Sequence, residues 1–330
     1  MNVLVAGGAG YIGSHTAKRL KEAGHSAVIY DNLSRGHRAV ADILKVPAVW
    51  ADLDDRAALA QALRRHAIDT VMHFAAYAYV GESVEKPLLY YHNNVATTVT
   101  VLAAMAQAGV EKFVFSSTCA IFGSPDRIPI NEDAAKGPVS PYGRSKLMVE
   151  QILADHQAAR PAFGFAALRY FNASGCAADG TLGEDHEPET HLIPRVLMAA
   201  TGRIDKLTVF GTDYPTPDGT NVRDYVHVDD LADAHILAME KMRPGEPMYL
   251  NLGTGRGFSV KEIIAAAQRV TGRPIRVEYG PRRAGDAVAL YADPSRARAV
   301  LGWQAKHTDP ESIIRSAWTW FVKNPKGYRK

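Results

Sequence analysis

Short apolar runs alternate with longer segments of helical spacing along the first half of the chain. Asn2–Ala6 is a continuous apolar run that ends directly at a group of glycines, which is typical of a strand buried on both faces of a parallel sheet. Apolar residues at helical spacing follow over Ile12–Ala23, and Gly24 ends that segment. The same alternation predicts strands at Ser26–Tyr30, Pro47–Ala51, Thr70–Phe74, Lys112–Ser116 and Phe163–Tyr170, and helices at Arg56–His66, Asn94–Gly109 and Tyr142–Gln157.

This alternation predicts an α/β fold with a doubly wound parallel Rossmann sheet. The regularity fades over 172–221, where Gly, Pro, Thr and Asp become frequent, as they are in loops. Met248–Leu252 is expected to be one more strand, and the chain beyond Val260 mixes helix and strand signals. We therefore predict a Rossmann domain over 1–171, rejoined by 222–258, and a smaller mixed α/β substrate domain over 172–221 and 259–330.

The composition is that of an ordinary globular chain. It has 330 residues, of which 47% are hydrophobic and 22% charged, and this excludes an intrinsically disordered protein. The 38 Lys and Arg exceed the 35 Asp and Glu by only three, and no run of basic residues is longer than two. A nucleic-acid partner is therefore not expected, because it would require a clustered basic face.

The cysteines indicate the cellular compartment, and the histidines show no recognisable metal-binding motif. The two cysteines, Cys119 and Cys176, do not form a disulfide scaffold, and a reducing cytoplasm is the expected location. The apolar run after Met1 is too short for a signal peptide or a membrane span, so no membrane partner is expected. The histidines are scattered without metal-ligand spacing, so no metal is predicted.

The first apolar run leads into a turn in which Gly7, Gly10 and Gly13 are spaced three residues apart. Glycine adopts a tight turn without a Cβ penalty, and the following helix directs its N–H groups at phosphates. Asp31 ends the second strand, near the roughly 20-residue offset of an acid that binds the adenosine ribose. Together they predict a dinucleotide site. The carboxylate favours NAD because it repels a 2′-phosphate, although two nearby arginines leave NADP open.

Tyr142 and Lys146 are four residues apart, so they lie on one face of the expected helix. A tyrosine with its usual pKa of about 10 is a poor base, and a nearby ammonium with a positive nicotinamide lowers that pKa. Thr118 follows a strand at the carboxyl edge of the sheet, where open α/β sheets bind ligands. Its hydroxyl is a candidate to hold the substrate oxygen that loses a proton. Alternatively, it satisfies a backbone group at the strand end.

The chain resembles the extended short-chain dehydrogenases/reductases, and specifically the UDP-glucose (UDP-galactose) 4-epimerases. The resemblance extends from Val3 to about Trp303. The run TDYPTPDGTNVRDYVHVDDLADAH is much more specific than the glycine turn, which the whole superfamily shares. The other matching stretches are VLVAGGAGYIGSHT, YDNLSRGH, DTVMHFAA, VGESVEKP, FVFSSTCAIFG, SPYGRSKLMVEQIL, LRYFNASG, NLGTG and RRAGD.

The resemblance implies a tightly held NAD, a UDP-sugar substrate and a two-step hydride mechanism. Tyr142 would remove the proton of the sugar 4-hydroxyl while the C4 hydride leaves for the nicotinamide. The 4-keto sugar would then rotate about its diphosphate link, and the hydride would return to the other face. Lys146 would lower the pKa of Tyr142 and hold the nicotinamide ribose, with Thr118 as the hydroxyl partner. A homodimer through the helices Asn94–Gly109 and Tyr142–Gln157 is also implied.

The resemblance further implies two sets of binding residues. Two of them, Arg223 and Arg283, make chemical sense because a guanidinium binds a diphosphate in bidentate fashion. The cofactor set, with Tyr142 and Lys146, is Gly7, Gly10, Tyr11, Ile12 and Gly13 at the pyrophosphate, Asp31 and Asn32 at the adenosine ribose, Asp52 and Leu53 at the adenine, and Phe74, Ala75, Ala76, Asn93, Ser116 and Tyr170 toward the nicotinamide. The substrate set, with Thr118 and Tyr142, is Asn172, His191, Leu192, Thr208, Val209, Phe210, Arg223, Arg283, Asp286 and Leu290.

Three positions depart from well-known family members. Ala78 stands where many epimerases place a lysine near the cofactor, so one cationic contact is lost unless another residue replaces it. His191 stands where an asparagine is common. Leu290 occupies the position that gates the sugar pocket, where some members carry a tyrosine, and the smaller residue leaves room beside the sugar C2. Activity on UDP-N-acetylglucosamine and UDP-N-acetylgalactosamine is therefore a further hypothesis.

Three alternative functions compete with the epimerase. A nucleotide-sugar 4,6-dehydratase needs an acid and a base directly after Thr118, but Cys119 and Ala120 follow it. A UDP-pentose (UDP-xylose/UDP-arabinose) 4-epimerase uses the same residues and stays open. A non-catalytic NAD-binding sensor or scaffold is disfavoured, because such proteins tend to lose the Tyr/Lys pair.

Overall fold

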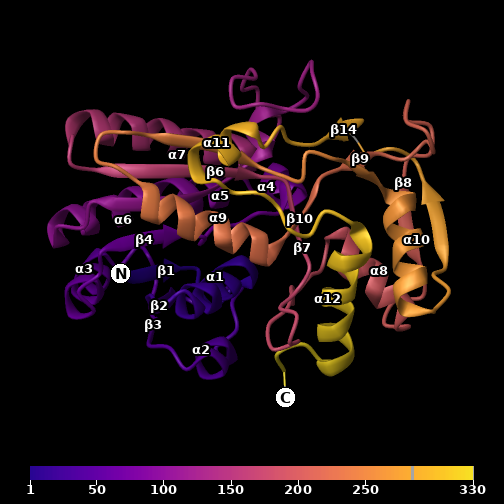
Figure 1. Ribbon diagram of the computed structural model, residues 1–330, viewed down its shortest axis with the longest axis horizontal. Coiled ribbons are helices and arrows are strands. Elements are labelled where there is room, and N and C mark those ends of the chain that lie inside the picture. The colour runs from indigo at the N-terminus through magenta and orange to yellow at the C-terminus, as the bar shows by residue number, and fades with distance from the viewer. Residues whose placement is uncertain (284–285, 330) are drawn as a thin grey trace.

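The computed structural model describes residues 1–283 and 286–329. Within these residues, seven parallel strands form one sheet in the order β11-β6-β5-β4-β1-β2-β3. Helices cover both faces of this sheet (Figure 1), and the α/β fold class expected from the sequence is confirmed. The strands are β1 (Asn2–Ala6), β2 (Ser26–Asp31), β3 (Ala48–Trp50), β4 (Thr70–His73), β5 (Lys112–Thr118), β6 (Gly164–Tyr170) and β11 (Met248–Leu252).

Successive side chains of the central strand enter opposite layers. Val3 and Val5 pack toward one layer, whereas Leu4 and Ala6 pack toward the other, and all four are fully buried. A strand covered on both sides has no polar face, which explains its continuous apolar sequence. The first layer contains α1 (Tyr11–Glu22), α2 (Ala39–Leu44) and α9 (Val228–Lys241), and the second contains α3 (Arg56–Arg65), α6 (Thr97–Ala108) and α7 (Pro141–Ala159).

The strand order reverses beside β1. The chain proceeds from β1 to β2 and β3 on one side, and then crosses back to place β4, β5 and β6 on the other. The carboxyl ends of β1 and β4 diverge into separate loops at this reversal. In open α/β sheets such a switch point forms the crevice that binds ligands. The fold therefore positions a binding cleft above β1 and β4.

Several helices differ from the sequence-based expectation. The expected helix Asn94–Gly109 begins as a π-helix, η1 (His92–Ala96), and continues as α6, which Gly109 ends in a left-handed conformation with φ of 76°. Two short helices, α4 (Val80–Glu85) and α5 (Pro87–Tyr91), precede η1. The helices α2 and α9 were not expected at all. The two aspartates in the first turn of α9 interact favourably with the positive end of the helix dipole. They mark the start of this helix in the sequence.

A smaller lobe lies beside the sheet, at the right of Figure 1. Its apolar core is formed mainly by three helices, α8 (Leu192–Ala200), α10 (Val260–Thr271) and α12 (Pro310–Lys323). The expected loop over 172–221 is therefore interrupted by β7 (Asn172–Ser174), α8 and β8 (Leu207–Phe210), whose signals were hidden among turn residues. The remaining strands are β9 (Val222–Arg223), β10 (Tyr225–His227), β12 (Phe258–Ser259), β13 (Val277–Gly280) and β14 (Ala289–Leu290).

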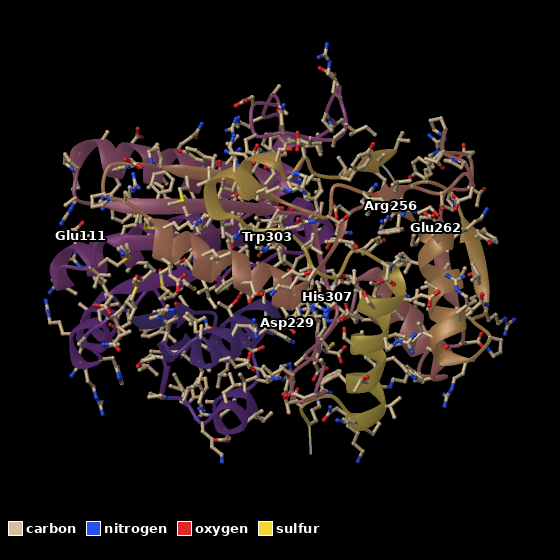
Figure 2. All side chains as sticks on the ribbon, in the orientation of Figure 1. Glu111, Asp229, Arg256, Glu262, Trp303 and His307 are labelled. Atoms are coloured by element: carbon tan, nitrogen blue, oxygen red, sulfur yellow. The ribbon has the colours of Figure 1, made fainter. Side chains whose placement is uncertain are left out.

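One C-terminal segment returns to the large sheet. Helix α11 (Ser295–Leu301) contacts α9 and β11, and Trp303 is buried in the same layer. The Trp303 indole donates a hydrogen bond of 2.8 Å to the carbonyl of Asp230, and His307 lies 3.2 Å from the Asp230 carboxylate. Trp303 and His307 are labelled in Figure 2. The expected division into two domains stays a prediction, and this segment lies in the part assigned to the substrate domain.

Candidate active site

The glycine turn connects β1 to α1, and steric contacts explain two of its three glycines. Gly7 has a φ of 78°, and a Cβ there would lie 2.5 Å from the backbone nitrogen of Ala75. A Cβ on Gly13 would lie 2.2 Å from the Gly7 carbonyl oxygen. Gly10 is different, because its nearest neighbour would be the same oxygen at 3.3 Å. Gly10 faces the cleft, so its missing side chain leaves room for an external group rather than for the protein.

The cleft above β1 and β4 contains about 610 Å³ of space that continues into solvent. Ten residues expected to bind the cofactor line it, namely Gly7, Gly10, Asp31, Asn32, Asp52, Leu53, Phe74, Ala75, Ala76 and Asn93. The others lie outside this lining, namely Tyr11, Ile12, Gly13, Ser116, Tyr142, Lys146 and Tyr170. Lining residues that were not named from the sequence as cofactor ligands are Tyr30, Ser34, Arg35, Gly36, Ala51, Tyr77 and Thr97.

Two carboxylates stand at the outer end of this cleft. Asp31 accepts hydrogen bonds from the backbone N–H of Ala9, at 3.0 Å, and of Leu33, at 2.8 Å. Burial nevertheless raises the pKa of Asp31 above its usual value. Asp52 accepts from the Asn32 amide at 2.8 Å, and hydrogen bonds, first from the N–H of Asp54, lower its pKa. Asp31 is therefore fixed by the glycine turn itself and presents a rigid acceptor to the cleft.

A cation also lines the cleft. Arg35 pairs with Glu82 at 3.1 Å, and its guanidinium carbon lies 4.8 Å from the centre of the Tyr79 ring. Ala78, which stands where many family members have a lysine, precedes Tyr79 in the segment after β4. Arg35 therefore places a guanidinium, paired with Glu82, beside the loop that lacks the lysine.

Helix α7 carries Tyr142 and Lys146 one turn apart. The Ser140 hydroxyl caps its start by accepting from the N–H of Gly143 at 3.1 Å. Lys146 is only 3% exposed and donates a hydrogen bond of 2.8 Å to the carbonyl of Ser116. Burial lowers the pKa of Lys146 to about 7, and the neighbouring Glu150 acts against this. The lysine is thereby aimed at the carboxyl end of β5.

Burial has the opposite effect on the tyrosine. It raises the pKa of Tyr142 well above the usual value, and Tyr170 adds to the rise, whereas the Thr118 hydroxyl acts in the other direction. Thr118 ends β5 directly opposite Tyr170 on β6. Its oxygen accepts from the N–H of Ala120 at 3.1 Å, the first turn of the short 3₁₀ helix Cys119–Phe122. The hydroxyl hydrogen is still available to a second acceptor.

A buried ion pair supports this face of α7. Arg169 on β6 contacts both oxygens of Glu150, at 3.0 and 2.7 Å, and Ser117 on β5 donates to the same carboxylate at 2.6 Å. Glu150 lies one turn beyond Lys146, so the pair fixes α7 against both strands. Nearer the cleft, Ser116 and Tyr170 share a short hydrogen bond between their hydroxyls. These contacts set the positions of Tyr142 and Lys146 along the strands.

Asn94 helps to build the site, although the sequence pointed to its neighbour Asn93 instead. Its side chain accepts from the N–H of Tyr77 at 2.9 Å and donates to the Tyr77 carbonyl and to the Ser145 hydroxyl, each at 3.0 Å. It therefore joins the loop that lines the cleft to the helix that carries Tyr142. The adjacent asparagines in an otherwise apolar helix were the available signal.

On the far side of Thr118, the structure brings together several of the expected substrate residues. Asp286 lies 2.9 Å from Arg283 and 3.8 Å from Arg223. The Arg283 guanidinium lies 5.1 Å from the ring centre of Phe210, the last residue of β8 after Thr208 and Val209. Two guanidinium groups thus share one carboxylate above an aromatic ring.

Leu290 lies directly opposite Arg223 in the pairing of β14 with β9. Its side chain packs against an apolar cluster that contains Ile121, Phe122 and Phe171. Because Ile121 and Phe122 belong to the turn after Thr118, Leu290 borders both the arginine and the end of β5.

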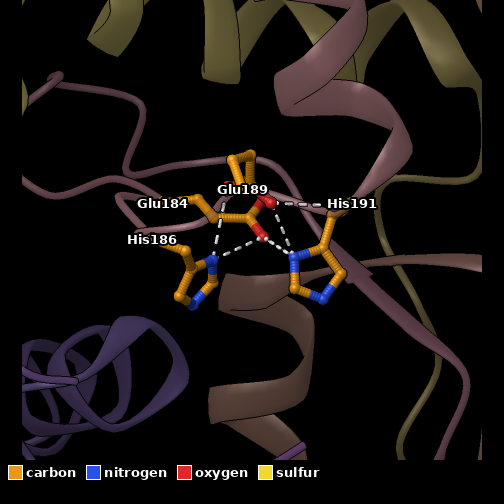
Figure 3. A group of neighbouring side chains, drawn as sticks. All are labelled: Glu184, His186, Glu189 and His191. Carbon is orange, nitrogen blue, oxygen red and sulfur yellow. Dashed lines mark hydrogen bonds and ion pairs between the residues drawn. The ribbon is translucent and has the colours of Figure 1, made fainter. Parts of the chain in front are cut away.

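The remaining expected substrate residues lie on two adjoining segments. Asn172 begins β7, two residues after Tyr170, and its N–H donates to the carbonyl of Asp224 at 3.0 Å. Leu192 is the first residue of α8, and His191 precedes it. His191 lies 2.9 Å from Glu184 and 3.0 Å from Glu189, within a group that also contains His186 (Figure 3). The structure therefore joins His191 to an acidic cluster that the sequence did not suggest.

Comparison with known proteins identifies the family of this chain. A family profile described as "Epimerase: NAD dependent epimerase/dehydratase family" matches residues 3–253. The chain belongs to this family. Among its curated relatives, the UDP-glucose 4-epimerase of Lactobacillus helveticus is 48% identical over 329 residues, which cover 99% of both chains.

Solved structures of family members share the whole fold. A UDP-glucose 4-epimerase from Stenotrophomonas maltophila, with bound NAD and formylated UDP-arabinopyranose, is 42% identical with a TM-score of 0.95, covering 99% of each chain. One from Bifidobacterium longum, in complex with NAD+ and UDP, is 40% identical with a TM-score of 0.95, covering 99% of this chain and 100% of the other. The family resemblance and the Rossmann sheet expected from the sequence are thereby confirmed.

The cleft of this chain fits the cofactor that the family name implies. Gly10 leaves open space against the start of α1, and that helix directs its first N–H groups toward the same cleft. The rigid Asp31 carboxylate stands where a ribose diol would meet an acceptor. In the part of the chain that the structure describes, no helix has the length and apolar character needed to cross a membrane.

Proposed function

We propose that this chain is a UDP-glucose 4-epimerase that interconverts UDP-galactose and UDP-glucose with a bound NAD. The observation that carries the proposal is the half-buried Tyr142 and the buried Lys146 on one face of α7, with Thr118 next to Tyr142, together with a cleft that fits a dinucleotide. The full-length likeness to UDP-glucose 4-epimerases supports the same reaction.

NAD supplies hydride acceptance from the sugar C4 and hydride return to the opposite face. Tyr142 takes the proton of the 4-hydroxyl and later gives it back, and Thr118 donates a hydrogen bond to that oxygen. Because burial raises the pKa of Tyr142, the phenol needs nearby positive charge to act as a base. Lys146 provides a charge on the same helix face when it is protonated, and its hydrogen bond to Ser116 keeps it oriented.

The arginines on the far side hold the diphosphate in this proposal. Asp286 keeps the guanidinium groups of Arg223 and Arg283 close together in the absence of substrate. A diphosphate offers each of them a stronger bidentate partner. Gripping the sugar nucleotide at the diphosphate leaves the 4-keto sugar free to turn, so that either face of C4 can meet the cofactor.

Leu290 sets the range of sugars. Its side chain is smaller than the tyrosine of some family members and lies near the end of β5, which supports acceptance of the N-acetylhexosamine pair as well as the hexoses. Leu290→Tyr should abolish turnover of UDP-N-acetylglucosamine while sparing UDP-galactose. Wild-type protein without any N-acetylhexosamine activity would contradict this role of Leu290.

A UDP-pentose 4-epimerase is the second candidate. The UDP-arabinopyranose derivative in the Stenotrophomonas maltophila relative favours it, because that protein holds a pentose on the same fold. The deciding experiment assays the purified chain on UDP-galactose, UDP-N-acetylglucosamine and UDP-xylose side by side, after bound nicotinamide is measured by absorbance. The proposal expects bound NAD and the highest kcat/KM for UDP-galactose. A preference for UDP-xylose would replace it with the pentose reaction.

We also propose a homodimer formed through α6 and α7, located in the cytoplasm. Exposed apolar residues on these helices, Val99 and Met148, support the interface, since such groups are commonly covered by a partner. Two free cysteines, Cys119 and Cys176, support a reducing compartment.

A further inference from the structure

Two histidines and two glutamates from one short segment converge beside α8 (Figure 3). The segment 184–191 follows the pattern Glu-x-His-x-x-Glu-x-His, and the four side chains offer ligand atoms that all lie within 4.8 Å of one another. Glu184 and Glu189 are deeply buried, with side-chain exposures of 4% and 7%. Neither the cofactor cleft nor the Tyr142 region includes them.

The distances between unlike ligands are equal to or somewhat shorter than those around a small tetrahedral ion. The Nδ1 atom of His191 lies 2.9 Å from Oε1 of Glu184 and 3.0 Å from Oε1 of Glu189, and the Nδ1 atom of His186 lies 3.4 Å from Oε1 of Glu184 and 3.3 Å from Oε2 of Glu189. Zinc bonds to imidazole nitrogen and carboxylate oxygen are about 2.0–2.2 Å, so ligand atoms at tetrahedral corners are about 3.4 Å apart. Two nitrogen and two oxygen donors suit Zn²⁺ better than the all-oxygen preference of Ca²⁺ or Mg²⁺.

A second observation points to a missing partner. The Oε1 atom of Glu184 is buried, yet it accepts no hydrogen bond from any residue within 1–283 or 286–329. It is nevertheless close to both imidazole Nδ1 atoms. The three atoms are thus at ion-pair distances without hydrogen-bond geometry between them, and a buried carboxylate oxygen without a hydrogen-bond donor is costly.

We propose that Glu184, His186, Glu189 and His191 bind one divalent transition-metal ion, best matched by Zn²⁺. Four protein ligands leave no open position, so the ion is structural and not catalytic. It anchors the segment 184–191, which leads directly into His191 and Leu192 at the start of α8.

The site connects to the cofactor domain. The Tyr79 hydroxyl donates to the carbonyl of Pro188 at 3.0 Å, and Arg35 donates to the carbonyl of Glu187 at 3.3 Å. Both donors come from segments around the cofactor cleft. Bound metal would therefore hold the wall between the cleft and α8 in one arrangement.

The test uses the full chain with its bound cofactor, stripped of metal by a chelator. Calorimetric titration with Zn²⁺ should show one ion per chain, and Co²⁺ should give the intense visible absorption of tetrahedral coordination. His186→Gln and Glu184→Gln should each weaken binding by more than about 100-fold, because loss of outer partners alone costs roughly 10–100-fold.

The matched control is His25→Gln, which removes a histidine that pairs with a single glutamate, Glu240, at 3.1 Å. It should bind Zn²⁺ as the wild type does. Circular dichroism checks that each variant is folded, and the Co²⁺ spectrum of the wild type tests the site without any variant. No stoichiometric uptake, an octahedral Co²⁺ spectrum, or equal uptake by wild type and His186→Gln would overturn the proposal.

Discussion

Lys146 is buried and Tyr142 is half-buried, and desolvation shifts their pKa values in opposite directions. The phenol is held protonated, whereas the pKa of the ammonium falls to about 7. Each group avoids its charged form in a site of low dielectric. A charged ligand that enters the cleft is therefore needed to bring the pair into its working ionisation state, which couples proton transfer to occupancy of the site.

Tyr142→Phe tests the proposed base. The change removes one hydroxyl, and kcat on UDP-galactose should fall by roughly 10²–10⁴-fold, the usual contribution of a positioned acid or base. NAD should still copurify, because Tyr142 lies outside the lining of the cofactor cleft. Steady-state kinetics and cofactor absorbance measure the two effects. An unchanged kcat would favour a non-catalytic NAD-binding protein.

Lys146 should also make stability depend on pH. Its pKa is about 7 in the folded chain and 10.5 when unperturbed, so the unfolded chain binds more protons between these values. The free energy of unfolding contributed by this group therefore rises with pH across that window. Urea unfolding at pH 7 and pH 9 should show a larger gain for the wild type than for Lys146→Met. Equal gains in both proteins would show that the ammonium is not buried.

At the scale of elements, the glycine turn depends on close contacts as well as on backbone conformation. Gly7→Ala should abolish copurification of NAD and destabilise the chain, because its Cβ would lie 2.5 Å from the Ala75 nitrogen at the cleft wall. Gly24→Ala is the matched control, since Gly24 has a similar φ of 82° but open space around it. That control should lose only about 1 kcal/mol, the cost of a left-handed conformation. Absorbance and urea unfolding compare the two variants.

Elements were predictable where the signal was local. The continuous apolar run Asn2–Ala6 and the turn after it agree with β1 and the start of α1 to within one residue. Helix α8 was missed, because Pro194 and the surrounding turn residues obscured an apolar face that only packing against α10 and α12 reveals. The π-helix before α6 was not predicted, and the buried Asn94 within it bonds to Tyr77 and Ser145, which are distant in the sequence.

Site residues, too, were predictable only where their signal was local in the sequence. Tyr142, Lys146 and Asp31 were visible because each belongs to a motif with a fixed spacing. The cation at Arg35 and the anchor at Asn94 were not assigned, because their roles arise from contacts between segments far apart in the chain. The convergence of His186 and His191 on two glutamates likewise requires the fold of the 184–191 segment.

At the scale of the whole molecule, α6 and α7 present apolar side chains outward. Val99 and Met148 are 48% and 40% exposed. Light scattering after gel filtration should give twice the chain mass for the wild type and the chain mass for the double variant Val99→Asp, Met148→Asp, because paired charges are costly to bury. Val322→Asp on α12, a similarly exposed valine, is the control and should stay dimeric. A dimeric double variant would place the interface elsewhere.

The central claim is that one carbon of the sugar loses and regains its own hydrogen within a single chain. The most direct measurement incubates the protein, without added NAD, with UDP-galactose deuterated at C4 in ordinary water, and analyses the product by NMR. The account predicts UDP-glucose that retains deuterium at C4, because the cofactor stays bound and solvent is excluded. No conversion, or UDP-glucose with hydrogen at C4, would contradict it.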